Sequence, residues 1–150
     1  MSGVLLAGLL EGVTIAVAGD DAPVSQAVAL GATTVALAVE DDMELAEAPD
    51  VLVAATGDID TAFIATRGAA NAWIAAERGG KVILIAPRDD AAQRAAHENL
   101  ARTLSIEWSR YGITPTAILP GSEQDVAELV AFLASPAGDY YSGCTFTLQT

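Results

Sequence analysis

Six short apolar runs alternate along the chain with longer stretches of helical periodicity, and this alternation constrains the fold more than any other feature. The runs are rich in Val and Ile, and most show no alternation of apolar and polar residues. Such runs are typical of strands buried on both faces, as in parallel sheets covered by helices. The expected strands are Val13–Ala18, Thr33–Val39, Asp50–Ala55, Lys81–Ala86, Thr114–Leu119 and Cys144–Leu148.

Helix-period stretches lie between these runs. Pro23 suits a first helical turn, where its missing N–H costs little, and glycines at 79, 80 and 112 are typical helix stops. The alternation predicts an α/β fold: a Rossmann-like doubly wound parallel sheet of about six strands, with helices on both faces, in one domain over residues 1–150. Glu40–Pro49 is an acidic linker, barely long enough for one or two helical turns. The expected helices are Pro23–Leu30, Ile59–Arg78, Asp89–Tyr111 and Glu123–Ala134.

The charge balance limits the partners. Twenty Asp and Glu residues against seven Lys and Arg give a formal net charge of -13, which would repel nucleic acid and anionic membranes. A single Cys144 and a single histidine exclude an intramolecular disulfide and give no metal-binding pattern. The apolar start has no basic region or cleavage pattern and is too short to cross a bilayer, so we expect a cytoplasmic protein.

Four segments have a distinctive sequence. Residues 97–121 (HENLARTLSIEWSRYGITPTAILPG) read as a long helix followed by a strand that ends in Pro-Gly. Residues 126–143 read as a helix and a turn into the last strand, residues 61–86 as a helix and a strand, and residues 9–19 as a first strand. Together they resemble the short-chain dehydrogenase/reductase family over nearly the whole chain, with gaps. The resemblance implies a shortened form of that family's fold.

The resemblance also says where catalytic residues should lie. In the family a tyrosine transfers the proton, a lysine lowers the pKa of the tyrosine and holds the ribose, a serine orients the substrate, and an asparagine supports a water relay. The tyrosine and lysine positions match Asp90 and Arg94, the asparagine position matches Asp58, and the serine end of the strand reads Ala-Pro-Arg at residues 86–88. An ionised aspartate has no proton to give, and arginine does not replace lysine. We therefore expect no catalytic residue of the family's type.

The loop after the first strand, residues 18–27 (AGDDAPVSQA), lies where a dinucleotide-binding protein keeps its phosphate loop. Such a loop works because glycines let the backbone approach the phosphates and a helix N-terminus offers free N–H groups. Only Gly19 remains here, and Asp20 and Asp21 are placed to cap the helix themselves and to repel a pyrophosphate. Glu40 follows the second strand where a ribose-binding acid could lie, although acidic residues are common there. We expect this chain to bind no NAD or NADP.

Internal losses relative to the family point the same way. The family has a substrate-covering loop after the Pro-Gly, whereas Ser122 begins the last helix here at once. A strand–helix unit before Asp50 and a long segment after Gly57 are also missing. Little then remains to exclude water from a reacting substrate.

In the family the two long helices pack against a partner subunit, and the last strand forms a second contact surface. Large aromatics are enriched among interface anchors, and an uncovered strand edge favours pairing. Core packing of the two tryptophans is the alternative. The expected contact residues are Trp73, Ala70, Leu100, Leu104, Trp108, Tyr141 and Phe146.

The first hypothesis is therefore a non-catalytic subunit that assembles with an active, full-length short-chain dehydrogenase/reductase, or failing that with itself. NAD or NADP would be bound by the active partner, and oxidoreductase activity, with a hydroxyacyl-CoA or a similar alcohol or ketone as a candidate substrate, would belong to the complex. Two alternatives stay open. One is an enzyme with altered chemistry around Asp58, Asp90, Arg94 and His97; the other is a homo-oligomer that binds a different small molecule in the emptied cleft. The simpler interpretation of Asp90 and Arg94 is a surface ion pair four residues apart, and that of His97 is a side chain that faces solvent or an interface.

Overall fold

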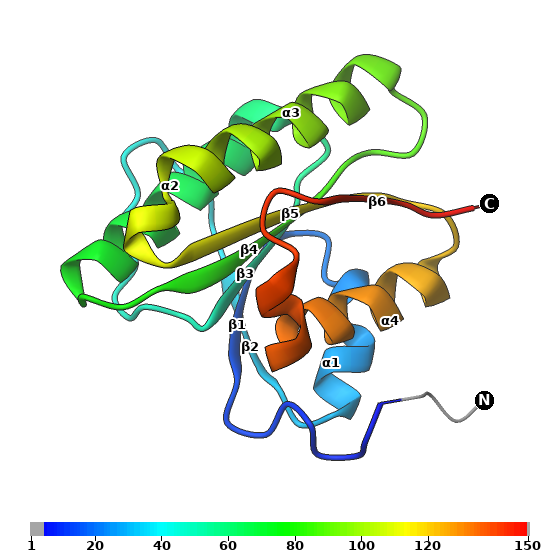
Figure 1. Ribbon diagram of the computed structural model, residues 1–150, viewed down its shortest axis with the longest axis horizontal. Helices are drawn as coiled ribbons and strands as arrows, with labels where there is room; N and C mark the ends of the chain where they lie inside the picture. Colours follow the sequence, from blue (N-terminus) through cyan, green and yellow to red (C-terminus); the bar gives the residue numbers. More distant parts are fainter. Residues whose placement is uncertain (1–4, 150) are drawn as a thin grey trace.

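All six apolar runs form strands, and the strands join one parallel sheet. The computed structural model describes residues 5–149 (Figure 1). Its strands are β1 (Thr14–Gly19), β2 (Thr33–Leu37), β3 (Val51–Ala55), β4 (Gly80–Ile85), β5 (Ile113–Leu119) and β6 (Thr145–Thr147). Its α-helices are α1 (Ser25–Ala29), α2 (Ile59–Ala75), α3 (Ala91–Glu107) and α4 (Glu123–Ala134).

The strand order is β2-β1-β3-β4-β5-β6, and every neighbouring pair is parallel. After β2 the chain crosses back over β1 to begin β3, so the direction of winding reverses between β1 and β3. Ligands of doubly wound sheets bind outside the carboxyl ends of the strands at such a switch point. The predicted fold class is confirmed.

Successive residues of the central strands enter two different cores, which explains why their sequences do not alternate. In β1, Ile15 and Val17 pack with α1 and α4, whereas Ala16 and Ala18 pack with α2 and α3. The helices accordingly form two layers, α2 and α3 on one face of the sheet and α1 and α4 on the other (Figure 1). Both faces of the central strands are therefore apolar.

The second strand differs from this expectation. Residues 33–36 of β2 are exposed, and the side chain of Leu37 is only partly buried. The sequence looks like that of a buried strand, but β2 lies at the edge of the sheet, and within residues 5–149 the one element that contacts it extensively is β1. The segment after it, Glu40–Pro49, forms no helix and has a single turn at residues 41–42.

Side chains begin the long helices, and a glycine ends one helical stretch. Asp58, Asp90 and Ser122 each accept a hydrogen bond from the backbone N–H three residues further on, at the start of α2, α3 and α4. Gly112 has a left-handed φ of 73° after the turn that follows α3, as a helix stop should. Pro23 lies in the first turn of a short 3-10 segment, Ala22–Val24, before α1.

Trp73 is the largest side chain that is completely buried, and it joins α2 to the sheet. Its indole Nε1–H donates a 2.5 Å hydrogen bond to the carbonyl oxygen of Pro49, just before β3. The ring also lies against Gly80 at the start of β4, where any Cβ would overlap the indole. Helix α2 is thus held by both a polar and a packing contact.

We expect the substitution Trp73→Phe to lower the free energy of unfolding by about 3 kcal/mol, because it leaves the Pro49 carbonyl unpaired and opens a gap beside Gly80. Denaturant titration followed by circular dichroism measures this loss. The matched control is Trp108→Phe, since Trp108 is only partly buried and should cost less than about 1 kcal/mol. Equal losses in the two variants would contradict this role for Trp73.

Candidate functional site

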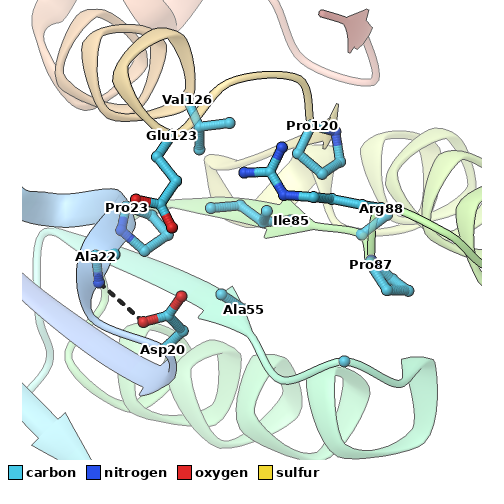
Figure 2. Close-up of a pocket in the computed structure, with 12 residues that line it drawn as sticks. Asp20, Ala22, Pro23, Ala55, Ile85, Pro87, Arg88, Pro120, Glu123 and Val126 are labelled. Carbon is cyan, nitrogen blue, oxygen red and sulfur yellow. Dashed lines mark hydrogen bonds between the residues drawn. The ribbon is translucent and has the colours of Figure 1, made fainter. Parts of the chain in front are cut away.

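A cleft of about 210 Å³ opens at the carboxyl ends of the strands, beside the switch point (Figure 2). Its apolar wall comes from the end of β4, the start of α4 and two proline-containing loops. Its charged groups come from three separate loops or helix ends. The lining residues are Asp20, Ala22, Pro23, Ala55, Gly57, Ile85, Ala86, Pro87, Arg88, Pro120, Glu123 and Val126.

Most backbone N–H groups of the loop after β1 already have acceptors within the chain. Gly19 has a φ of 89°, and a Cβ there would overlap the carbonyl of Ala55 on β3. The Asp20 carboxylate accepts the backbone N–H of Ala22 at 3.1 Å, the contact drawn in Figure 2. Asp20 therefore stabilises this turn, but neither Asp20 nor Asp21 caps α1 with its side chain, so the prediction that both cap the helix is wrong. The nearest helix, α1, has only five residues.

Two carboxylates and one guanidinium line the mouth of the cleft. Glu123 projects from the first turn of α4, and Arg88 extends into the cleft from the loop after β4 (Figure 2). Within residues 5–149, Arg88 forms no ion pair of 4.0 Å or less with either Asp20 or Glu123. The three groups give the cleft a formal net charge of -1.

Asp58 and Asp90 both serve as helix caps. The Asp58 carboxylate accepts the Thr61 N–H at 2.8 Å, and the Asp90 carboxylate accepts the Gln93 N–H at 3.0 Å. The backbone hydrogen bond from Thr61, followed by the one from its side chain, holds the pKa of Asp58 below its usual range. Because the ionised form is the one stabilised, Asp58 is unsuited to donate a proton near neutral pH.

Arg94 also forms hydrogen bonds to the backbone. Its Nη1 donates to the carbonyl oxygens of Pro87 and Arg88, each at 3.4 Å, and so supports the loop that lines the cleft. A surface ion pair between Asp90 and Arg94 was the simplest expectation for this spacing. The part of the chain that the structure describes contains no such pair.

His97 is a residue of α3 and is completely buried, which corrects the expectation that it faces solvent or an interface. Its Nδ1 contacts the carbonyl oxygen of Gln93 at 2.6 Å, while Nε2 is buried with no partner in residues 5–149. The side chain of Gln93 accepts the N–H of Ile59 at 2.8 Å and ties α3 to the start of α2. Sequence reasoning missed Gln93, because nothing in its spacing marks it as a link between helices.

Arg88 and Glu123 were also missed as cleft residues. Their signal was positional: Arg88 follows the end of a buried strand, and Glu123 begins the helix after the Pro-Gly. Side chains at the carboxyl ends of parallel strands converge at one edge of the sheet, so both positions could have been singled out.

The expected contact residues fall into two groups. Trp73, Ala70 and Leu104 are buried within the chain, so the prediction that they contact a partner is wrong; they pack in the core that α2 and α3 share. The others are partly buried and keep exposed surface: Leu100, Trp108, Tyr141 and Phe146.

Two aromatic clusters involve the partly buried residues. Trp108 stacks on Phe63 of α2 with ring centroids 6.5 Å apart. Tyr141 contacts Phe132 of α4 at 5.8 Å and Phe146 of β6 at 5.6 Å. These rings fasten α3 to α2 and the last strand to α4.

The described residues, 5–149, contain neither a metal-binding cluster nor a membrane-spanning helix. In this range no three His, Cys, Asp or Glu side chains come close enough together to hold a metal ion. No helix in the same range combines the length and the apolar character needed to cross a membrane. Cys144 is a free, exposed thiol.

No family's sequence model matches this chain, and no curated protein matches it. Solved structures do. BdcA from E. coli matches with a TM-score of 0.76 and 22% identity, covering 93% of this chain and 100% of that chain. A short chain dehydrogenase from Mycobacterium smegmatis matches with a TM-score of 0.81 and 18% identity, covering 100% and 97%.

A third similar structure, from Agrobacterium tumefaciens, is described as a proposed 2-deoxy-d-gluconate 3-dehydrogenase with bound NADP. It matches with a TM-score of 0.81 and 20% identity, covering 93% of this chain and 96% of that chain. Identities of this size establish a common fold and nothing finer. The chain has the Rossmann-like α/β fold of the short-chain dehydrogenases/reductases.

We expect the cap at Asp58 to make stability depend on pH. Its pKa is lowered in the folded state, so its contribution is fully present above the unfolded pKa near 4 and is lost as the pH falls through the folded value. Asp58→Ala should cost about 1 kcal/mol at pH 7. Asp58→Asn keeps a side-chain acceptor for the Thr61 N–H and should lose only the part of the stability that depends on ionisation of the carboxyl group.

Urea titrations between about pH 3 and pH 7 test this expectation. The difference in stability between the native chain and Asp58→Asn should shrink toward the acid end. A difference that stays constant over this range would show that the carboxylate is not stabilised by the fold.

Proposed function

We propose that this chain is a non-catalytic subunit that assembles with an active short-chain dehydrogenase/reductase, or otherwise with itself, and supports its partner's structure. The observation that carries the proposal is the use of Asp58, Asp90 and Arg94. Two cap helices and the third holds a loop. These three side chains, at positions that match catalytic positions of the family, all form hydrogen bonds to backbone groups.

The cleft supports the same view. Asp20 and Glu123 line it, only Arg88 offers a positive charge, and Gly19 is packed on β3. NAD or NADP would accordingly be bound by the partner, and a hydroxyacyl-CoA or another alcohol or ketone would be the partner's substrate. A homo-oligomer that takes a different small molecule into the cleft is the alternative that the 210 Å³ volume leaves open.

The α2–α3 layer offers the surface for assembly. Ile106 on α3 is 74% exposed and Ile74 on α2 is 40% exposed, and the partly buried Trp108 lies at the end of α3. Exposed apolar side chains of this kind stabilise a helix-to-helix interface when a partner covers them. A partner with two long helices of its own would complete a four-helix contact.

The isolated chain should bind NADPH or NADH with a dissociation constant weaker than about 1 mM, because two carboxylates face the place of the pyrophosphate. Isothermal titration calorimetry of the purified chain measures this. An active full-length short-chain dehydrogenase/reductase, titrated under the same conditions, is the positive control. Micromolar binding by this chain would overturn the proposal that it carries no cofactor.

Assembly should depend on the exposed face of α3. Co-expression with a full-length short-chain dehydrogenase/reductase of the same cell should give a complex of fixed stoichiometry by multi-angle light scattering. Ile106→Arg should weaken it by tenfold or more, on the order of the loss of one interface anchor. Val28→Arg, on α1 in the opposite layer and 49% exposed, should leave the complex intact. A folded monomer that captures no such enzyme contradicts the proposal.

A further inference from the structure

Strand β2 offers an open edge of the sheet. It pairs with β1 on one side, and within residues 5–149 no strand pairs with its other side. Unpaired edges are normally protected by a proline, a lysine or a covering loop. The five residues of β2, TTVAL, include neither a proline nor a charge, and Val35 is 49% exposed.

The register shows which backbone groups are free. The Thr33 N–H donates to the Val13 carbonyl at 2.9 Å, so Thr33 faces β1. Backbone groups of successive strand residues point in opposite directions within the plane of the sheet. Thr34 and Ala36 therefore present their N–H and C=O groups outward, spaced to bond another extended segment.

An apolar groove of about 540 Å³ runs beside this edge, over β1 and β2 on the α2 side of the sheet. Ala16, Val35 and Leu37 line it from the sheet, and Met43 and Leu45 line it from the segment after β2. This segment packs against α2. A Cβ on Gly68 of α2 would lie 3.1 Å from side-chain atoms of both Met43 and Leu45. The groove lies between the segment and the strand, and no helix residue of the described chain lines it.

The rim of the groove is acidic. Glu40, Glu44 and Glu47 all line it, and in residues 5–149 none of them forms a salt bridge. Asp42, beside them, pairs with Arg67 at 3.6 Å. A second copy of this chain would bring the same carboxylates to the edge, on a chain of net charge -13, and like charges oppose that pairing. A segment rich in Lys or Arg matches the rim.

We propose that β2 and this groove bind an extended basic segment of another protein by strand addition. The segment's backbone pairs with Thr34 and Ala36, its apolar side chains enter the groove beside Val35, and its Lys or Arg side chains meet the glutamates of the rim. Main-chain bonds give affinity in this mode, and alternate side chains give specificity. This surface is separate from the α2–α3 face, so the inference does not depend on the proposed function.

The probe is a fluorescein-labelled ten-residue peptide of alternating Lys and Val, titrated with the full chain by fluorescence anisotropy. Ala36→Pro should weaken binding by about tenfold or more, because the ring removes an outward N–H and blocks the approach while the bonds from β2 to β1 remain. Ala36→Val keeps the N–H and should bind within about threefold of the native chain.

A second peptide of the same sequence, N-methylated at alternate residues, needs no change in the protein and keeps the test decisive if Ala36→Pro does not fold. It has the same charge and side chains but cannot pair along its backbone, so its binding should fall by about tenfold or more. If it binds as well as the parent peptide, the strand-addition proposal is wrong.

Charge is tested separately. The triple variant Glu40→Gln, Glu44→Gln, Glu47→Gln should weaken the peptide and flatten the salt dependence of its binding, since screening acts on exposed charges. A triple variant with the same change in net charge on other exposed glutamates, Glu11→Gln, Glu77→Gln and Glu107→Gln, should bind normally. Equal losses of peptide affinity in the two triple variants would show non-specific attraction and would contradict recognition by the rim. Dimerisation abolished by Ala36→Pro would assign the edge to a second copy and overturn the proposal.

Discussion

The central strands must bury both of their faces, and the rest of the molecule is arranged around this requirement. Alternate residues of β1, such as Ile15 and Ala16, belong to different cores, so a layer of helices is needed on each side. In a parallel sheet all strands end on the same side, and each connection crosses back to the opposite side before the next strand begins. The loops after β1, β3, β4 and β5 are thereby brought together, and the cleft forms where they meet.

The same convergence explains why several side chains at the carboxyl ends of the strands bond to backbone groups. Helices α2 and α3 begin at this edge, and their first turns have unpaired N–H groups that need acceptors. Asp58 and Asp90 supply them, and Arg94 bonds the carbonyls of the adjoining loop. At Asp58 the hydrogen bonds from Thr61 lower the pKa of the carboxyl group, so its ionised form is stabilised. A residue engaged in this way maintains the fold and is a poor proton donor.

Much of the fold could be predicted because burial leaves a strong pattern. The runs of Val and Ile predicted all six strands to within about two residues, and the helices followed from what lay between them. The predictions were wrong where one sequence pattern fits two different structural environments. An apolar helix position that faces the sheet looks like one that faces a partner, so Trp73 and Ala70 were misplaced. Thr33–Leu37 reads as a buried strand, and only the strand order reveals that it is an edge.

The candidate site was harder to predict for a related reason. The resemblance located Asp58, Asp90 and Arg94, but their bonds to the backbone were not predicted, although an aspartate just before a helix is a common cap. Arg88 and Glu123 lie far apart in the chain and meet only because β4 and α4 share one edge of the fold. Loops that converge in space carry no periodicity, so their contacts follow from topology and not from local sequence.

The open edge and the acidic segment have a common origin in the missing cover over β2. Without a helix on this face, an apolar strand of five residues would pair with any other edge, including that of a second copy. Carboxylates at residues 40–47 oppose such self-pairing by repulsion. The same charges attract a basic segment, so one set of side chains both protects the edge and selects its partner. Specificity of this kind needs repulsion of the wrong partner as much as attraction of the right one.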